Sequence, residues 1–405
     1  MSVQWIRRCR PWGHALTDVR IEDGRIVDLR PHDPPAVLAD GPEVLDGRGR
    51  LLLPSLTDTH CHLDSNRVGL PFRAHTGGPG VWQMMMNDRV NWRGAEVPII
   101  ERTTSLLGRM VAHGAGSVRS FAQVDVDCGL ERLEAVLAAR EAHQDRVRVQ
   151  VVAFPQAGLL REDGSAKVLE QALREGADVV GGIDPCQLDR DPARHLDIVF
   201  GLAERHGVPV DIHLHEPGEL ARFSASLIVE RTEALGMQGK VLISHGYGLF
   251  GQDAGLPGIL DDLARADIAL STVAPGSAPP LPLARLVEHG IRVGLGQDGQ
   301  RDYWSPYGNG DMLDRTWQLA FTQGYRPDQL VEHAVAVATI GGRSITSGTP
   351  RLRSIEDRPG VSKGDPADLL LVGEEAVTAA VMDRPADRTV LYGGRVVADG
   401  LDLIG

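Results

Sequence analysis

The sequence predicts an α/β fold: a (β/α)₈ TIM barrel with a small β-sandwich domain formed by both termini. In the middle of the chain, short apolar runs alternate with helical patterns, which is typical of βαβ units and a parallel sheet. About eight such runs are present, which is the number that a closed barrel needs. The two ends of the chain have a different pattern, of short strands joined by tight turns.

The terminal segments are expected to form one domain because they share this β-rich pattern. Near the N-terminus, ALTDVRIEDGRIVDLR has an Asp-Gly turn between two alternating segments, and ADLLLV and RTVLYGGRVVADG near the C-terminus are similar. We therefore expect residues 1–50 and 365–405 to form the small β-sandwich domain. Residues 51–364 are expected to form the barrel, which is the catalytic domain.

Eight segments are candidate barrel strands because each is a short, mostly apolar run. In chain order they are LLLPSL (51–56), SVRSFAQV (117–124), VRVQVVAF (147–154), DVVGGI (178–183), VPVDIHL (208–214), KVLISH (240–245), DIALST (267–272) and IRVGLGQ (291–297). Helical patterns such as GLERLEAVLAAREAH lie between them. A doubly wound open sheet is the alternative, but no Gly-x-Gly-x-x-Gly follows an early strand, which favours the barrel.

Composition limits the classes of function. A net charge of −13 argues against a nucleic-acid or anionic-membrane surface. The four cysteines form no Cys-x-x-Cys pair, so neither a thiolate zinc site nor a disulfide framework is indicated. The N-terminal segment lacks the apolar core of a signal peptide, and no run of 18 apolar residues occurs. We therefore expect a cytoplasmic protein that acts on a small molecule and has no nucleic-acid or membrane partner.

Ionisable side chains gather at the predicted strand ends, which meet at one rim of a barrel. They are His60, His62, Asp184, His213, His245 and Asp298. A chain with 14 histidines in 405 residues contains a His-x-His pair by chance roughly half the time, so the pair in TDTHCHLD is weak by itself. The presence of further ionisable residues at the other strand ends is what indicates a functional site.

The residue types in this cluster predict a metal centre. His60 and His62 lie two positions apart in an extended segment, so both imidazoles point to the same side. Imidazole nitrogens and a carboxylate suit zinc or iron(II), and a bound water reaches a pKa of about 7. We expect one divalent metal ion, Zn²⁺ or Fe²⁺, and the predicted ligands are His60, His62, His213 and Asp298. No lysine lies near the strand at 178–183, which argues against a second metal bridged by a carboxylated lysine.

Catalysis at such a centre also needs groups that move protons. Glu216, three residues after His213, is the predicted carrier of protons to the leaving group. His245 is expected to steady or deprotonate the metal-bound water. Asp298, besides being a predicted metal ligand, is predicted to be catalytic together with Glu216 and His245. His215 should face the opposite side of the strand from His213, so we expect a structural role for it.

Together these motifs resemble the amidohydrolase superfamily, and within it the branch of bacterial cytosine deaminase and N-isopropylammelide isopropylamidohydrolase. The resemblance spans nearly the whole chain. Its most specific pieces are THCHLD, VRVQVVAFPQAG, ADVVGGIDP, DIHLHEPG, VLISHGYG and DGQRDYWSPYGNGDM. It implies a barrel with a terminal β-sandwich, the four metal ligands given above, and His245 as the histidine beside the metal-bound water.

The resemblance also implies roles for single residues. Glu216 falls where cytosine deaminase has its proton-shuttling glutamate and the isopropylamidohydrolase has aspartate. Gln156 matches a glutamine that hydrogen-bonds the substrate ring, and Trp304 matches a tryptophan that closes the pocket. We add Asp184, at the end of the fourth predicted strand, to the expected substrate contacts.

Two departures from these relatives and one further segment bear on the substrate. Gly299 stands where cytosine deaminase has a second aspartate, and Gln123 stands where both relatives have histidine. A polar partner lost from a pocket changes which substrate groups can be satisfied, so both changes argue against cytosine itself. The segment 75–92, HTGGPGVWQMMMNDRVNW, either covers the barrel mouth or only packs against the barrel.

The sequence thus predicts a hydrolase that deaminates a small nitrogen heterocycle with a metal-activated water. The alternatives are removal of a substituted amine from a triazine-like ring and hydrolysis of a cyclic or acyclic amide. A barrel that only binds a ligand is disfavoured, because it has no need for the complete set of ligands and proton carriers. The partner is expected to be a small heterocyclic substrate, and the protein is expected to be a homo-oligomer.

Overall fold

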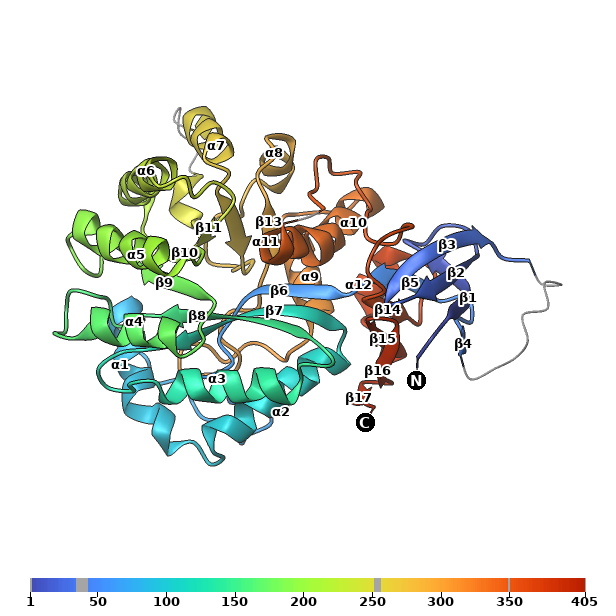
Figure 1. The fold of residues 1–405 in the computed structure, drawn as a ribbon, viewed down its shortest axis with the longest axis horizontal. Coiled ribbons are helices and arrows are strands. Elements are labelled where there is room, and N and C mark those ends of the chain that lie inside the picture. Colours follow the sequence, from blue (N-terminus) through green and yellow to red (C-terminus); the bar gives the residue numbers. More distant parts are fainter. Residues whose placement is uncertain (1, 34–42, 251–255, 349, 405) are drawn as a thin grey trace.

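The computed structural model describes residues 2–33, 43–250, 256–348 and 350–404 (Figure 1). The described chain forms a barrel of parallel strands and a separate sheet at one side, where both termini lie (Figure 1). Among the described helices, none is both long and apolar enough to cross a membrane.

Eight parallel strands form the barrel, and each hydrogen-bonds to its neighbour in chain order. They are β6 (Leu56–Cys61), β7 (Ala115–Gln123), β8 (Arg148–Phe154), β9 (Val179–Ile183), β10 (Val210–Leu214), β11 (Val241–His245), β12 (Ala269–Thr272) and β13 (Val293–Leu295). The ring closes beyond β13, where Asp298 forms a parallel bridge with Cys61 and donates its backbone N–H to the His60 carbonyl at 2.8 Å. The Asp58 carboxylate strengthens this closure by accepting from the backbone N–H groups of His60 and Gln297.

Helices surround the barrel (Figure 1). They are α1 (Val81–Asn91), α2 (Ile99–Ala112), α3 (Glu131–Ala142), α4 (Ser165–Arg174), α5 (Pro192–His206), α6 (Gly218–Ala234), α7 (Leu256–Arg265), α8 (Leu283–Glu288), α9 (Met312–Thr322), α10 (Asp328–Ala336) and α11 (Gly342–Ser347). The ends of α5 show how the sequence sets a boundary. Asp191 caps its first turn by accepting from the Arg194 N–H, Pro192 occupies the first turn, and Gly207 ends the helix with a φ of 68°.

The second sheet is built from both termini, as the sequence predicts. Its strands are β1 (Trp5–Pro11), β2 (Thr17–Glu22), β3 (Arg25–Pro31), β4 (Val44–Asp46), β5 (Leu51–Pro54), β14 (Leu369–Val372), β15 (Arg388–Tyr392), β16 (Arg395–Asp399) and β17 (Asp402–Leu403), with α12 (Val377–Asp383) between β14 and β15. The predicted Asp-Gly turn joins β2 to β3, and both turn residues have positive φ.

The strand predicted at 51–56 is wrong in one respect. Residues 51–54 form β5, which pairs with β1 and β14 of the terminal sheet, and the first barrel strand is β6. Fully buried leucines suit either sheet, so the apolar run does not tell which one it joins. The barrel strand itself looks polar because Asp58 and Thr59 are buried with hydrogen-bond partners inside the closure. His60 therefore lies within β6, and only His62 lies beyond it.

Candidate metal centre and active site

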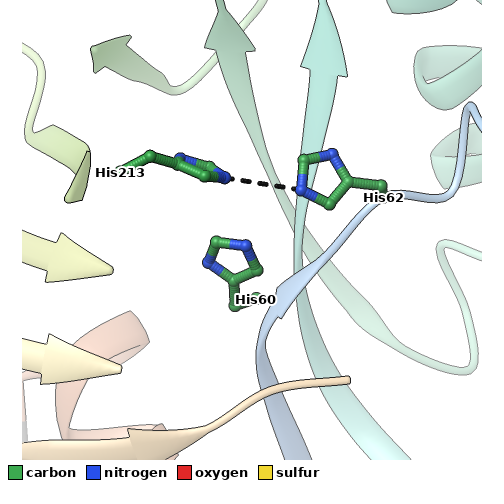
Figure 2. A group of neighbouring side chains, drawn as sticks. All are labelled: His60, His62 and His213. Atoms are coloured by element: carbon green, nitrogen blue, oxygen red, sulfur yellow. Dashed lines mark hydrogen bonds between the residues drawn. The ribbon is translucent and has the colours of Figure 1, made fainter. Parts of the chain in front are cut away.

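The four predicted metal ligands lie together at the carboxyl ends of the barrel strands. The rings of His60, His62 and His213 converge on one point (Figure 2). The Nε2 atoms of His62 and His213 are 3.4 Å apart. Asp298 Oδ1 lies 3.5 Å from His60 Nε2 and 3.4 Å from His62 Nε2. β6, β10 and the residues after β13 therefore each bring at least one ligand to the same place.

These distances fit one metal ion. Tetrahedral coordination with bonds of about 2.1 Å places neighbouring ligand atoms about 3.4 Å apart. His60 is fully buried, and within the described chain its Nε2 has no hydrogen-bond partner, so that nitrogen is available as a ligand. Three imidazoles and one carboxylate form a donor set that suits a transition metal such as zinc or iron(II).

The protonation states of the ligands also suit a metal. Burial lowers the pKa of His60 to about 4 and lowers the pKa of His213, so both imidazoles are neutral at physiological pH. Burial raises the pKa of Asp298, but the close approach of His60 Nε2 and the other nearby histidines bring that pKa well below the usual range. A neutral imidazole and an ionised carboxylate are the forms that bind a metal.

His245 lies beside this ligand group at the end of β11. Its ring centroid is 4.6 Å from that of His60 and 5.1 Å from that of His213. The backbone at His245 and Asp298 has φ values of 69° and 64°, in the left-handed region that costs non-glycine residues roughly 1 kcal/mol. Strained backbone at two adjacent functional positions is typical of a site whose geometry is held by the surrounding fold.

Glu216, the predicted proton carrier, points elsewhere. Its side chain is fully buried, and it is not among the residues that line the cavity at the metal ligands. Oε1 accepts from the backbone N–H groups of Cys186 and Gln187 at 2.6 and 2.8 Å, and Oε2 accepts from the Ser224 hydroxyl at 2.5 Å. In this arrangement Glu216 holds the chain after β9, and both of its oxygens are occupied.

His215, which the strand pattern assigns a structural role, instead lines the cavity. Its ring centroid is 4.3 Å from that of His245. Asp184 accepts from its backbone N–H at 2.6 Å, and the carboxylate lies 2.8 Å from its Nδ1. Asp184 is buried behind His215 and does not itself line the cavity, so it contacts His215 and not the substrate space. The predicted outward orientation of His215 is wrong because β10 ends at Leu214, so strand alternation does not extend to residue 215. The signal available in the sequence was the pair Asp184 and His215, which follow neighbouring strands.

A cavity of about 750 Å³ opens beside the predicted metal ligands His62, His213 and Asp298, and its size suits a small organic ligand. Gln156 and Trp304, the predicted substrate contacts, both line it. Gln156 is nearly buried, and among the described residues its Nε2 has no partner, so it can donate a hydrogen bond to a bound ring. Arg315 also lines the cavity and donates to the carbonyls of Val273 and Gln297.

The two unusual residues noted in the sequence differ in their consequences. Gly299 lines the cavity, and a Cβ atom there would lie 2.1 Å from Asp302 Oδ2, so the Asp302 carboxylate occupies the space of a side chain at 299. Gln123 does not line the cavity. Its Nε2 donates to Asp125 at 2.7 Å.

Segment 75–92 packs at the barrel mouth, against the side of the cavity wall that faces away from the cavity. Val81 and Trp82 of α1 pack on an apolar cluster that includes Phe121 and Phe154. The ring of Phe154 stacks on His213 with centroids 4.1 Å apart, so this cluster directly contacts one of the predicted metal ligands. No described residue of 75–92 lines the large cavity itself.

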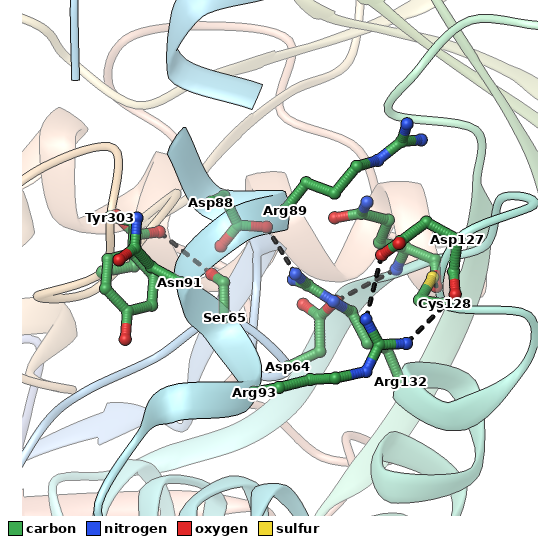
Figure 3. A network of polar contacts seen from close by, with 12 residues as sticks. Asp64, Ser65, Asp88, Arg89, Asn91, Arg93, Asp127, Cys128, Arg132 and Tyr303 are labelled. Atoms are coloured by element: carbon green, nitrogen blue, oxygen red, sulfur yellow. Dashed lines mark hydrogen bonds and ion pairs between the residues drawn. The ribbon is translucent and has the colours of Figure 1, made fainter. Parts of the chain in front are cut away.

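Buried charges fix α1 in this position. Figure 3 shows Arg132 of α3 between Asp88 of α1 and Asp64, the residue two positions after His62. Arg132 is hydrogen-bonded to Asp88 and lies 3.5 Å from Asp64, and all three side chains are almost completely buried. The guanidinium also lies over the Trp92 ring, 4.5 Å from its centroid. The network connects α1 to the chain segment that carries two of the predicted metal ligands, His60 and His62.

Comparisons with known proteins agree with this architecture. Residues 99–398 match the family model described as Amidohydrolase family. The structure of N-isopropylammelide isopropylaminohydrolase from Burkholderia multivorans is similar over the full length of both chains, with a TM-score of 0.90 and 34% identity. N-isopropylammelide isopropyl amidohydrolase of Pseudomonas sp. (strain ADP) is 28% identical over 362 residues, which is 87% of each chain. The structure of 5-methylcytosine deaminase from Klebsiella pneumoniae has a TM-score of 0.80 and 25% identity, covering 98% of this chain and 97% of the other. With these matches, and with the motifs and site described above, the chain belongs to the amidohydrolase family.

Proposed function

We propose that this protein hydrolyses a carbon–nitrogen bond of a small nitrogen heterocycle and uses one Zn²⁺ or Fe²⁺ ion held by His60, His62, His213 and Asp298. The observation that carries the proposal is that His60, His62, His213 and Asp298 lie together under a ligand-sized cavity, with three of the separations between their ligand atoms at 3.4–3.5 Å. The proposal also includes a cytoplasmic location and a homo-oligomeric state.

The residues of the cavity suggest how the reaction proceeds. A metal ion held by His60, His62, His213 and Asp298 would activate water for attack on an electron-poor ring carbon. His245 is placed to take a proton from that water, and Gln156 and Trp304 are placed to orient the ring. A carbon–oxygen bond forms and the carbon–nitrogen bond breaks. One water proton leaves with the amino group as ammonia, and the other stays with the oxygenated product.

His215 is the proton carrier that the geometry favours. It faces the cavity and its ring is held by Asp184, whereas both Glu216 oxygens accept hydrogen bonds from other residues. We expect His215→Asn to lose turnover while the metal stays bound. Glu216→Gln should keep most of the turnover, because the amide oxygen can still accept from the two backbone N–H groups and the amide nitrogen can donate to the Ser224 hydroxyl. Loss of turnover in Glu216→Gln without a loss of stability would instead make Glu216 the carrier, as the family resemblance implies.

Removal of a substituted amine is the second candidate reaction. It is favoured by the higher similarity to N-isopropylammelide isopropylaminohydrolase, 34% identity against 25% for 5-methylcytosine deaminase. A screen of amino- and alkylamino-substituted pyrimidines, pterins and triazines, with separate detection of ammonia and alkylamine, tests both reactions. Ammonia release from an amino-substituted ring supports deamination, and alkylamine release alone supports the second reaction. Release of neither product from any ring would refute the proposed function.

A further inference from the structure

The second ring nitrogen of His60 belongs to a buried hydrogen-bond chain inside the barrel. His60 Nδ1 lies 2.9 Å from the Ser244 hydroxyl oxygen, which lies 2.7 Å from Asp211 Oδ1. Arg119 Nη1 donates to the other Asp211 oxygen at 3.0 Å. All four side chains are almost completely buried, so no solvent competes for these hydrogen bonds.

The donors and acceptors of this hydrogen-bond chain determine which ring nitrogen of His60 carries the proton. A carboxylate paired with Arg119 can only accept, so the single hydroxyl proton of Ser244 goes to Asp211. The Ser244 oxygen must then accept from His60, which places the imidazole proton on Nδ1. The other nitrogen, Nε2, keeps its lone pair, and it is the nitrogen that faces Asp298 and the other ligands.

The end of this hydrogen-bond chain that lies away from His60 is Arg119, which is held by further hydrogen bonds in the barrel wall. Arg119 Nη2 and Nε donate to Gln150 Oε1 at 2.9 and 3.2 Å, and Gln150 Nε2 donates to the Thr346 carbonyl at 3.2 Å. The five side chains come from β6, β7, β8, β10 and β11. The orientation of one imidazole is thus tied to five different strands.

We propose that Ser244, Asp211 and Arg119 are positioning residues that fix the tautomer and orientation of His60 and so set the affinity of the protein for its metal ion. This inference rests on the proposed function, since it takes His60 to be a metal ligand. A hydrogen bond that a ligating imidazole donates from its second ring nitrogen toward a carboxylate raises the basicity of the imidazole, and its loss commonly weakens metal binding by about 10–100-fold. In this protein the carboxylate is that of Asp211, and the Ser244 hydroxyl connects it to His60.

Ser271 provides a matched control. It lies directly opposite Ser244 in the pairing of β11 with β12, and it is equally buried. Its hydroxyl is 2.7 Å from that of Thr59 and does not contact His60. Ser244→Ala and Ser271→Ala therefore each remove one buried, hydrogen-bonded hydroxyl group, but only the first should affect the metal.

The test is the zinc dissociation constant, measured by competition with a chromophoric chelator in wild type, Ser244→Ala, Ser244→Thr, Asp211→Asn and Ser271→Ala. We expect about 10–100-fold weaker binding in Ser244→Ala and Asp211→Asn, and near-normal binding in Ser244→Thr, which keeps a hydroxyl, and in Ser271→Ala. Melting temperatures of the metal-free proteins should fall similarly in both alanine variants. Equal zinc affinity in these two variants would overturn the positioning role while leaving the metal site intact. Failure of wild type to bind stoichiometric zinc or iron would overturn the proposed function and this inference with it.

Discussion

Replacing Gly299 by alanine should disturb the cavity through Asp302. The new Cβ would lie 2.1 Å from Asp302 Oδ2 and 2.8 Å from its Cγ, so the carboxylate must move. In its present position Asp302 accepts from the Ser65 hydroxyl at 3.0 Å and from the backbone N–H groups of Trp304 and Ser305 at 2.8 Å. At about 1 kcal/mol for each hydrogen bond, displacement costs about 3 kcal/mol.

Thermal unfolding and steady-state kinetics together measure this effect. Gly276→Ala is the control, because Gly276 lines the same cavity but a Cβ there has open space. We expect a lower melting temperature and a higher KM in Gly299→Ala, because Trp304 loses its backbone anchor, and little change in Gly276→Ala. In an Asp302→Ala background the Gly299→Ala change should cost little more, since the clash is then absent. Equal effects of both glycine substitutions, or full additivity with Asp302→Ala, would refute the reasoning.

Two other substitutions test buried charge and protonation. His333 is fully buried, neither ring nitrogen has a partner among the described residues, and burial lowers its pKa to about 4 from about 6.5 in the unfolded chain. Below pH 6.5 the unfolded state takes up a proton that the folded state excludes, so stability falls by roughly 3 kcal/mol as the pH approaches 4. His333→Leu should remove this part of the acid sensitivity, so its melting temperature should fall less than that of wild type between pH 7 and 4. Parallel plots of melting temperature against pH for the two proteins would contradict the assignment of this acid sensitivity to His333. Arg132→Met should destabilise the fold by about 3–5 kcal/mol, because it leaves Asp88 and Asp64 buried without their cation. An unchanged urea midpoint in Arg132→Met would show that the ion pairs contribute little.

The ligand cluster was predictable from the sequence because a parallel barrel brings the carboxyl ends of its strands to one rim. Residue type and strand-end position therefore placed His60, His62, His213 and Asp298 together without knowledge of any contact. The run at 51–54 was misassigned because buried leucines satisfy both sheets equally well. The pairing of β5 with β1 and with β14, which lies more than 300 residues later, decides between them.

The orientation of individual side chains depended on contacts that no local pattern contains. Glu216 is held by backbone groups about 30 residues earlier in the chain and by Ser224 on α6. His215 faces the cavity because the strand ends before it and Asp184 binds it. The role of Asp302 in filling the space at Gly299 likewise arises from the path of the loop after β13.

The metal content of purified protein tests the central claim most directly. Elemental analysis of active wild type should find about one zinc or iron atom per chain, and Asp298→Asn and His62→Asn should lose both the metal and the release of amine. Gln318→Ala, which alters the cavity wall but no ligand, should keep the metal. Active wild-type protein without stoichiometric transition metal, or full metal content in Asp298→Asn and His62→Asn, would contradict the account.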